Sequence, residues 1–199
     1  AEKNAVNVLD HDGKTTTLQT KKILIATGSR VRELPFAKSN GKTIHTSDTI
    51  LFIDHIPQSL CIVGGGVVGM EFASMFGRMG SEVTVIELAK QVLPYEDPEV
   101  VKDFTRHIKK QNVKIKNGVK VADIKEKGKK VEVTIEGEKA ESFDCVLVSI
   151  GRAPVTEEIG LDKVGITTDK GFIDTNEHYQ TSVSNIYAIG DVLKTPALA

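Results

Sequence analysis

The sequence is poor in the features that mark several protein classes. It holds only two cysteines in 199 residues, Cys61 and Cys145, and each stands inside an apolar run. This usage favours reduced, buried thiols over a disulfide framework or a zinc site. Neither sign of charge dominates, since 26 Lys and Arg balance 27 Asp and Glu, and no basic cluster suggests nucleic-acid binding. A membrane-spanning helix needs about 18 consecutive apolar residues, and no apolar run approaches this length. No signal peptide opens the chain. We therefore expect a cytoplasmic protein that binds neither nucleic acid nor a membrane.

The composition that is present fits one or two globular domains. Hydrophobic residues make up 40% of the chain and charged residues 27%, which is enough for a sizeable core. Near the start, alternating runs flank an Asp-Gly turn at 12–13 and lead to a buried-strand pattern at 23–26. Near the end, a strand-like run at 186–189 precedes Gly190. Both ends look like cuts inside a domain, and we expect the chain to be a piece of a longer protein.

Between the ends, the hydrophobic period changes in a readable order. Residues 34–58 are rich in Pro, Gly, Ser and Asp and are expected to form a linker with a short helix, for which Ser47 is the N-cap. A strand at 60–63, a helix at about 67–79 and a strand at 82–86 follow. The sequence thus predicts a strand–helix–strand unit.

A second crossover and a change of period come next. Asp97 is the expected N-cap of a helix that starts with Pro98 and has apolar residues at helical spacing: Val100, Val101, Phe104 and Ile108. The hydrophobic period then drops to two residues in the runs on either side of Gly128, and a continuous apolar run at 145–150 follows. We expect a three-stranded β-meander at about 119–148. The predicted class is α/β, a Rossmann-like parallel sheet with crossover helices and this meander, in a domain at 59–153.

The segment between the first strand and helix carries a binding motif. It reads GGGVVG, with Gly64, Gly66 and Gly69 at the positions of G-x-G-x-x-G and Gly65, Val67 and Val68 between them. In this context the first glycine allows a tight turn, the second lets the backbone approach a pyrophosphate, and the third lets the helix lie close to the strand. The phosphates would lie on the free N–H groups of the helix N-terminus. The alternative is a glycine turn that binds nothing.

Glu87 ends the second strand, where a carboxylate accepts hydrogen bonds from an adenosine ribose. A 2′-phosphate at this position would face a negative charge and would need arginines in the loop that follows. The sequence there, ELAKQVLP, offers only Lys90. The motif with Glu87 therefore predicts NAD as the cofactor, in preference to NADP.

Four segments together carry a family resemblance. ILIATGS, GGGVVGMEFASMFGRMGSEVTVIE, VSIGRAPVTEEIGLDKVGI and NIYAIGDV occur in the order and rough spacing of the pyridine nucleotide-disulfide oxidoreductases. Within that family the chain most resembles the members that oxidise dihydrolipoyl groups, because PALA follows closely after YAIGDV. Glutathione reductase-like members prefer NADP, and mercuric reductases resemble the chain less around KTPALA.

The resemblance implies how the chain is organised. Residues 1–33 correspond to the end of a flavin-binding domain, 59–153 to the NAD domain, and 154–199 to the start of a central domain that returns to the flavin. The redox disulfide and the catalytic His-Glu pair of the family are not found here, so no catalytic residue and no metal site is assigned. In the intact protein, electrons from a dihydrolipoyl group would pass through the disulfide and FAD to NAD⁺. The implied partners are a lipoyl-bearing acyltransferase of a 2-oxoacid dehydrogenase complex and a second copy of the chain.

Further site residues carry over from the family by position. Glu71 matches a glutamate that helps to place the nicotinamide ring, although a first-turn carboxylate favouring the helix dipole is an alternative. Val121 matches a position that contacts adenine, or is an ordinary strand residue. Gly151 matches a glycine near the nicotinamide, and the role of the neighbouring Arg152 is left open, with a simple surface charge as one interpretation.

Two positions carry over to the flavin, Gly28 and Asp191. Asp191 is expected to accept from the ribityl chain, and the alternative is that both are turn residues at strand ends. NADH oxidases, transhydrogenases and mercuric reductases remain alternatives within the enzyme class. A nucleotide-binding module without redox chemistry is the alternative outside it.

Overall fold

The structure, a computed structural model, describes residues 4–195. The chain divides into two compact units, one from the described parts of Ala1–Arg30 and Arg152–Ala199 and the other from Val31–Gly151. The PALA segment at 196–199 lies outside the described residues. Within the described part, no helix is both long and apolar enough to cross a membrane.

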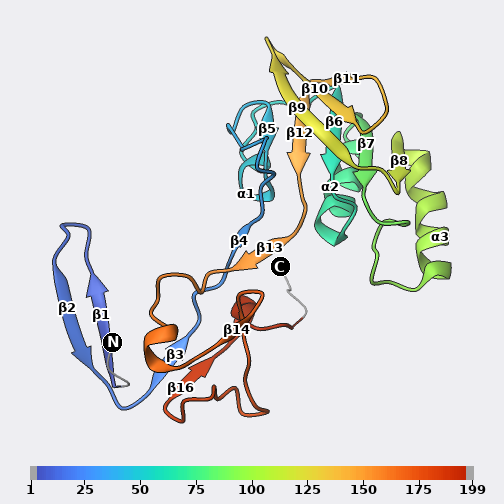
Figure 1. Ribbon diagram of the computed structural model, residues 1–199. Helices are drawn as coiled ribbons and strands as arrows, with labels where there is room; N and C mark the ends of the chain where they lie inside the picture. The colour runs from blue at the N-terminus through green and yellow to red at the C-terminus, as the bar shows by residue number, and fades with distance from the viewer. Residues whose placement is uncertain (1–3, 196–199) are drawn as a thin grey trace. The chain divides into compact units, whose positions relative to one another are not determined.

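The second unit is built on a five-stranded parallel sheet (Figure 1). Its strands are β5 (Ile44–His45), β6 (Ser59–Val63), β7 (Glu82–Glu87), β8 (Val113–Asn117) and β12 (Cys145–Val148). Their order across the sheet is β5-β12-β6-β7-β8, and every neighbouring pair is parallel. The predicted α/β class with a parallel sheet is confirmed.

Four connections join these strands, and the three that follow β6 have the types predicted from the hydrophobic periods. The first is α2 (Val67–Arg78), and the second is α3 (Pro98–Ile108), which continues into a short 3₁₀ turn, η1 (Lys109–Gln111). Asp97 caps α3 as expected, because its Oδ1 accepts from the N–H groups of Glu99 at 2.8 Å and Val100 at 3.3 Å.

The third crossover is the predicted antiparallel meander. It consists of β9 (Val121–Lys127), β10 (Lys130–Ile135) and β11 (Glu141–Phe143), in the order β11-β10-β9. It ends at 143, earlier than the expected 148, because the buried run that follows is β12 of the parallel sheet.

Alternate residues of the sheet face two different cores. Leu60 and Ile62 pack in one cluster with the buried faces of α2 and α3, whereas Cys61 and Val63 pack in another with the meander. Successive side chains of a strand point to opposite faces, so a strand covered on both sides is apolar throughout. The continuous apolar run of β6 follows from this covering.

Residues 34–58, expected as a linker with a short helix, contribute to the sheet of the second unit. Their strand β5 pairs in parallel with β12, so that Ile44 lies opposite Val146. The helix is α1 (Ser47–Ile50), and its N-cap is Thr46, one residue before the expected Ser47. The Thr46 N–H donates to Oγ1 of Thr49 at 3.0 Å, which stabilises this start.

The first unit consists of short strand pairs. The hairpin of β1 (Ala5–Leu9) and β2 (Thr15–Gln19) encloses the expected turn. The other strands are β3 (Ile23–Ile25), β4 (Ser29–Val31), β13 (Arg152–Pro154), β14 (Thr168–Asp169), β15 (Phe172–Ile173) and β16 (Ile186–Ala188), with 3₁₀ turns η2 (Asp162–Val164) and η3 (Gly190–Val192). The pairs are β3 with β16, β4 with β13 and β14 with β15.

The expectation that residues 23–26 form a buried strand is only partly correct. Ile25 is buried in the core of this unit, but Leu24 is 58% exposed. β3 pairs in parallel with β16 in a sheet of two strands, and alternate residues of such a sheet face away from the core.

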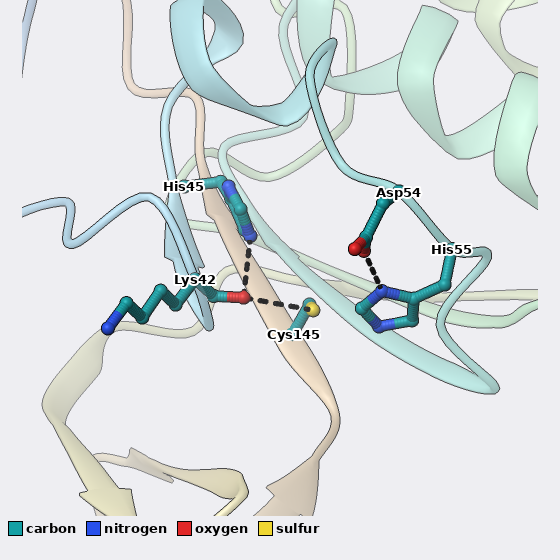
Figure 2. Close-up of polar contacts among 5 residues, drawn as sticks. All are labelled: Lys42, His45, Asp54, His55 and Cys145. Carbon is teal, nitrogen blue, oxygen red and sulfur yellow. Dashed lines mark hydrogen bonds and ion pairs between the residues drawn. The ribbon is translucent and has the colours of Figure 1, made fainter.

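Both cysteines are free and buried, as expected. Cys61 is fully buried and Cys145 is 2% exposed, and burial raises the pKa of both thiols. Neither thiol is therefore suited to act as a nucleophile. Figure 2 shows Cys145 beside the Lys42 carbonyl oxygen, which also accepts from Nε2 of the buried His45 at 3.1 Å.

His45 makes the stability of the second unit depend on pH. Its Nδ1 is buried with no hydrogen-bond partner among the described residues, and burial lowers the pKa of the imidazole below 6.5. Because the folded state holds the neutral ring, stability is complete above the unfolded pKa and falls as the pH drops below about 6.5. We expect the melting temperature of His45→Gln to decline less between pH 7 and pH 5 than that of the wild type.

The matched control is His55→Gln. The His55 side chain is 62% exposed and bonds to Asp54 at 2.7 Å at the surface (Figure 2). His55→Gln and His45→Gln contain the same number of histidines, and they differ in whether a buried or an exposed ring is removed. Equal slopes of melting temperature against pH in the wild type and His45→Gln would contradict the assignment.

Candidate functional site

The glycine loop lies at the carboxyl end of β6, as expected, and two of its glycines are required by the packing of the protein itself. Gly64 has φ +108°, and a Cβ there would lie 2.1 Å from the Ser149 carbonyl oxygen. A Cβ at Gly69 would lie 2.0 Å from the carbonyl oxygen of Gly64. The lack of a Cβ at Gly64 allows the tight turn, and the lack of a Cβ at Gly69 allows the close approach of α2 to β6.

Gly66 differs from every other described glycine. Its φ is −70°, which any residue adopts, and a Cβ there would meet no atom within 4 Å. The other described glycines have either a positive φ or a close neighbour. Neither its φ nor its packing among the described residues requires glycine, although glycine is a favourable residue at this N-cap of α2. The open space beside Gly66 can admit a group that approaches the backbone from outside, such as a pyrophosphate.

The start of α2 supplies donors for this group. Among the described residues, no hydrogen bond joins the N–H groups of Gly66, Val67 or Val68 to a partner. The side chains of Val67 and Val68 are 56% and 40% exposed, so this turn faces solvent. Free N–H groups and the positive end of the helix dipole favour an anion here.

Glu87 reaches the glycine loop from the neighbouring strand. It ends β7, and its Oε2 accepts from the N–H of Gly65 at 2.6 Å. Its Oε1 accepts from the N–H of Ala89, also at 2.6 Å. Each carboxylate oxygen can accept more than one hydrogen bond, so both can still bind ribose hydroxyls. The carboxylate is held in one orientation before any ligand is bound.

The remaining candidate residues for dinucleotide binding lie on different elements of the second unit. Glu71 is the fifth residue of α2 and is exposed, so the alternative of a first-turn carboxylate does not apply. Val121 begins β9 and is 8% exposed in the core with Ile86, which leaves its backbone to contact a ligand. Gly151 follows β12 with φ +100°, and its carbonyl oxygen accepts from the Arg32 N–H at 2.9 Å.

The two flavin candidates come together in the first unit. Gly28 follows β3 and Asp191 follows β16, and these strands are parallel, so their carboxyl ends lie at one edge. Ser29 donates its hydroxyl to Oδ2 of Asp191 at 2.5 Å. The other Asp191 oxygen can accept from a hydroxyl such as those of a ribityl chain, so these residues fit a flavin.

Arg152 is more than a surface charge. Its Nε donates to the Ser29 hydroxyl at 2.7 Å and its Nη2 donates to the Ser29 carbonyl oxygen at 2.9 Å. Sequence reasoning missed Ser29 and this role of Arg152. The only signal was that Ser29 follows Gly28 directly, whereas Arg152 lies far away in the sequence. Within residues 4–195, no group of His, Cys, Asp and Glu is arranged to hold a metal ion.

Comparison with known proteins defines the family. The model of the family described as pyridine nucleotide-disulphide oxidoreductase matches residues 1–199. The chain belongs to this family, as the resemblance implied.

Curated relatives and solved structures agree with this assignment. The mitochondrial dihydrolipoyl dehydrogenase of Pisum sativum is 43% identical over 94% of this chain and 39% of its own length. That of Dictyostelium discoideum is 41% identical over 98% of this chain and 42% of its own length. The crystal structure of LpdA from Mycobacterium tuberculosis, 30% identical, superposes with a TM-score of 0.90 over 96% of this chain and 42% of that chain. The chain thus spans about two fifths of the length of these relatives.

Proposed function

We propose that the chain forms the NAD-binding part of a flavoprotein disulfide oxidoreductase of the dihydrolipoyl dehydrogenase type. The whole protein would oxidise a dihydrolipoyl group with NAD⁺, and its partners would be a second copy of the chain and a lipoyl-bearing acyltransferase. The similarity to two dihydrolipoyl dehydrogenases along nearly the whole chain supports this choice. When bound, FAD supplies the hydride transfer between the disulfide and the nicotinamide.

The observation that carries the proposal is the open space at Gly66. The N–H groups of residues 66–68 would hold the pyrophosphate, and the Glu87 carboxylate would hold the adenosine ribose. Glu71 would lie towards the nicotinamide. These residues bind and orient the dinucleotide, and none of them acts as an acid, base or nucleophile.

NAD is proposed in preference to NADP because of the charge at the ribose site. Glu87 would stand against a 2′-phosphate, and Lys90 is the only basic residue in the loop that follows. Like charges in contact cost several kcal/mol unless they are neutralised.

We expect the purified chain to bind NADH at least about tenfold more tightly than NADPH, because only the phosphate differs between them. Isothermal titration calorimetry with each dinucleotide at two salt concentrations measures both affinities. The preference should shrink at high salt, since screening weakens the repulsion of the exposed phosphate. Equal affinities at low salt would overturn the assignment of Glu87.

A further inference from the structure

Gly65 occupies a variable position of the motif, yet the protein surrounds it closely. Its N–H donates to Glu87 at 2.6 Å, and its carbonyl oxygen accepts from the Leu93 N–H at 2.7 Å. A Cβ at Gly65 would lie 2.6 Å from Cγ1 of Val92 and 3.1 Å from Cβ of Glu87. The two polar backbone groups and the Cα of Gly65 therefore contact the last residue of β7 and the segment that follows it.

Residues 89–93, which we call the strap, are fixed at both ends. At one end, the carbonyl oxygen of Ala89 accepts from the Gly118 N–H at 2.8 Å. At the other end, Val92 is fully buried in the core between the sheet and the helices α2 and α3, and Leu93 has the unusual φ of +49°. A leucine in the left-handed region is strained, and the surrounding contacts must hold it there. The Leu93 carbonyl oxygen also accepts from the Glu96 N–H at 3.0 Å.

The strap also limits the movement of Glu87. Glu87 is bonded to Gly65 on one side and to Ala89, the first residue of the strap, on the other. The carboxylate can keep this orientation only while Gly65 and the strap keep their separation. The Val92 side chain lies beside Gly65, in the space that a Cβ at Gly65 would enter.

We propose that Val92 is a positioning residue of the dinucleotide site, which acts through Gly65 to aim the Glu87 carboxylate at the ribose. This proposal rests on the proposed dinucleotide binding. Val92 is not proposed to contact the ligand itself. Its role is to fix the spacing between the glycine loop and the strap, and with it the discrimination between NADH and NADPH.

The test uses a pair of compensating substitutions in the full chain. Gly65→Ala adds a methyl group that collides with Val92, so the strap is pushed away and NADH affinity falls by about tenfold. Val92→Ala removes the colliding Cγ1, so Gly65→Ala/Val92→Ala recovers most of this loss. Val92→Ala alone leaves space beside Gly65, and the ratio of NADH to NADPH affinity falls by about threefold or more.

Val113→Ala is the matched control. Val113 is a buried valine of the same core, on β8, and it is not among the atoms nearest to Gly65. Its truncation lowers the melting temperature as Val92→Ala does. It leaves the NADH to NADPH ratio unchanged and does not rescue Gly65→Ala. A ratio that responds equally to both valine truncations would overturn the positioning role.

The thermal data separate this inference from the proposed function. Calorimetric titration with NADH and NADPH is combined with melting followed by circular dichroism for all variants. The spacing role of Val92 is contradicted if the double variant has neither a higher melting temperature nor a higher NADH affinity than Gly65→Ala. This conclusion does not depend on which dinucleotide the wild type binds. If the double variant melts at a higher temperature than Gly65→Ala but the wild type binds neither dinucleotide, the packing of Val92 against Gly65 is confirmed. The dinucleotide role of Val92 is then overturned together with the proposed function.

Discussion

Replacing Gly66 with alanine is expected to weaken NADH binding by about tenfold to a hundredfold while the fold remains intact. The added Cβ meets no protein atom within 4 Å and requires no change of φ, so the free protein accommodates it. The methyl group instead occupies the space that the pyrophosphate would approach, and overpacking of this kind costs about 1–3 kcal/mol. Titration calorimetry gives the affinity, and thermal melting reports the fold.

Gly64→Ala is the opposite case in the same loop. At φ +108° and 2.1 Å from the Ser149 carbonyl oxygen, its Cβ strains the folded state directly. We expect a loss of about 2 kcal/mol or more in the free energy of unfolding. If Gly66→Ala bound NADH as the wild type does, the pyrophosphate would have to bind elsewhere. If it lost as much stability as Gly64→Ala, the fold itself would require this glycine, and its presence would no longer point to a ligand beside it.

Glu87→Arg is expected to reverse part of the cofactor preference. The change removes a ribose acceptor, and the loss of a charge-assisted hydrogen bond costs about 1.5–3 kcal/mol, or about tenfold to a hundredfold in NADH affinity. NADPH should improve relative to NADH because arginine supplies a forked donor to a phosphate. The N–H groups of Gly65 and Ala89 also lose their carboxylate and become free to bind an anion.

Glu87→Gln separates charge from geometry in this experiment. Glutamine keeps the length of the side chain and one acceptor oxygen, but it cannot accept from both N–H groups through two oxygens. We expect it to lose NADH affinity without the gain for NADPH that arginine gives. An unchanged ratio of NADH to NADPH affinities in Glu87→Arg, with the circular dichroism spectrum intact, would mean that the ribose is held elsewhere.

The elements with strong local signals could be predicted from the sequence. Asp97 before Pro98 marks the start of α3, and the three glycines mark the change from β6 to α2. The two-residue strand β5 could not be found in this way. It is too short to show a period, and it is held by pairing with Val146 and Leu147, far along the chain. Composition alone therefore suggested a linker.

The site could be predicted to the extent that it follows chain order. Parallel strands bring their carboxyl ends to one edge, so the meeting of Glu87 with the glycine loop follows from the predicted topology. The contact of Val92 with Gly65 depends on how the loop after β7 folds back, and the bonds from Arg152 to Ser29 depend on the pairing of the short strands β4 and β13. No spacing rule encodes such contacts, because the connecting segments are irregular.

The Arg32–Gly151 hydrogen bond joins the two ends of the second unit. Because the Arg32 N–H lies 2.9 Å from the Gly151 carbonyl oxygen, residues 31–151 enter and leave this unit at nearly the same point. A segment with adjoining ends can be inserted into a host or removed from it with little distortion, since closing a short gap costs little chain entropy. The second unit could therefore be transferred to another host protein, and a short link between its two ends would allow circular permutation.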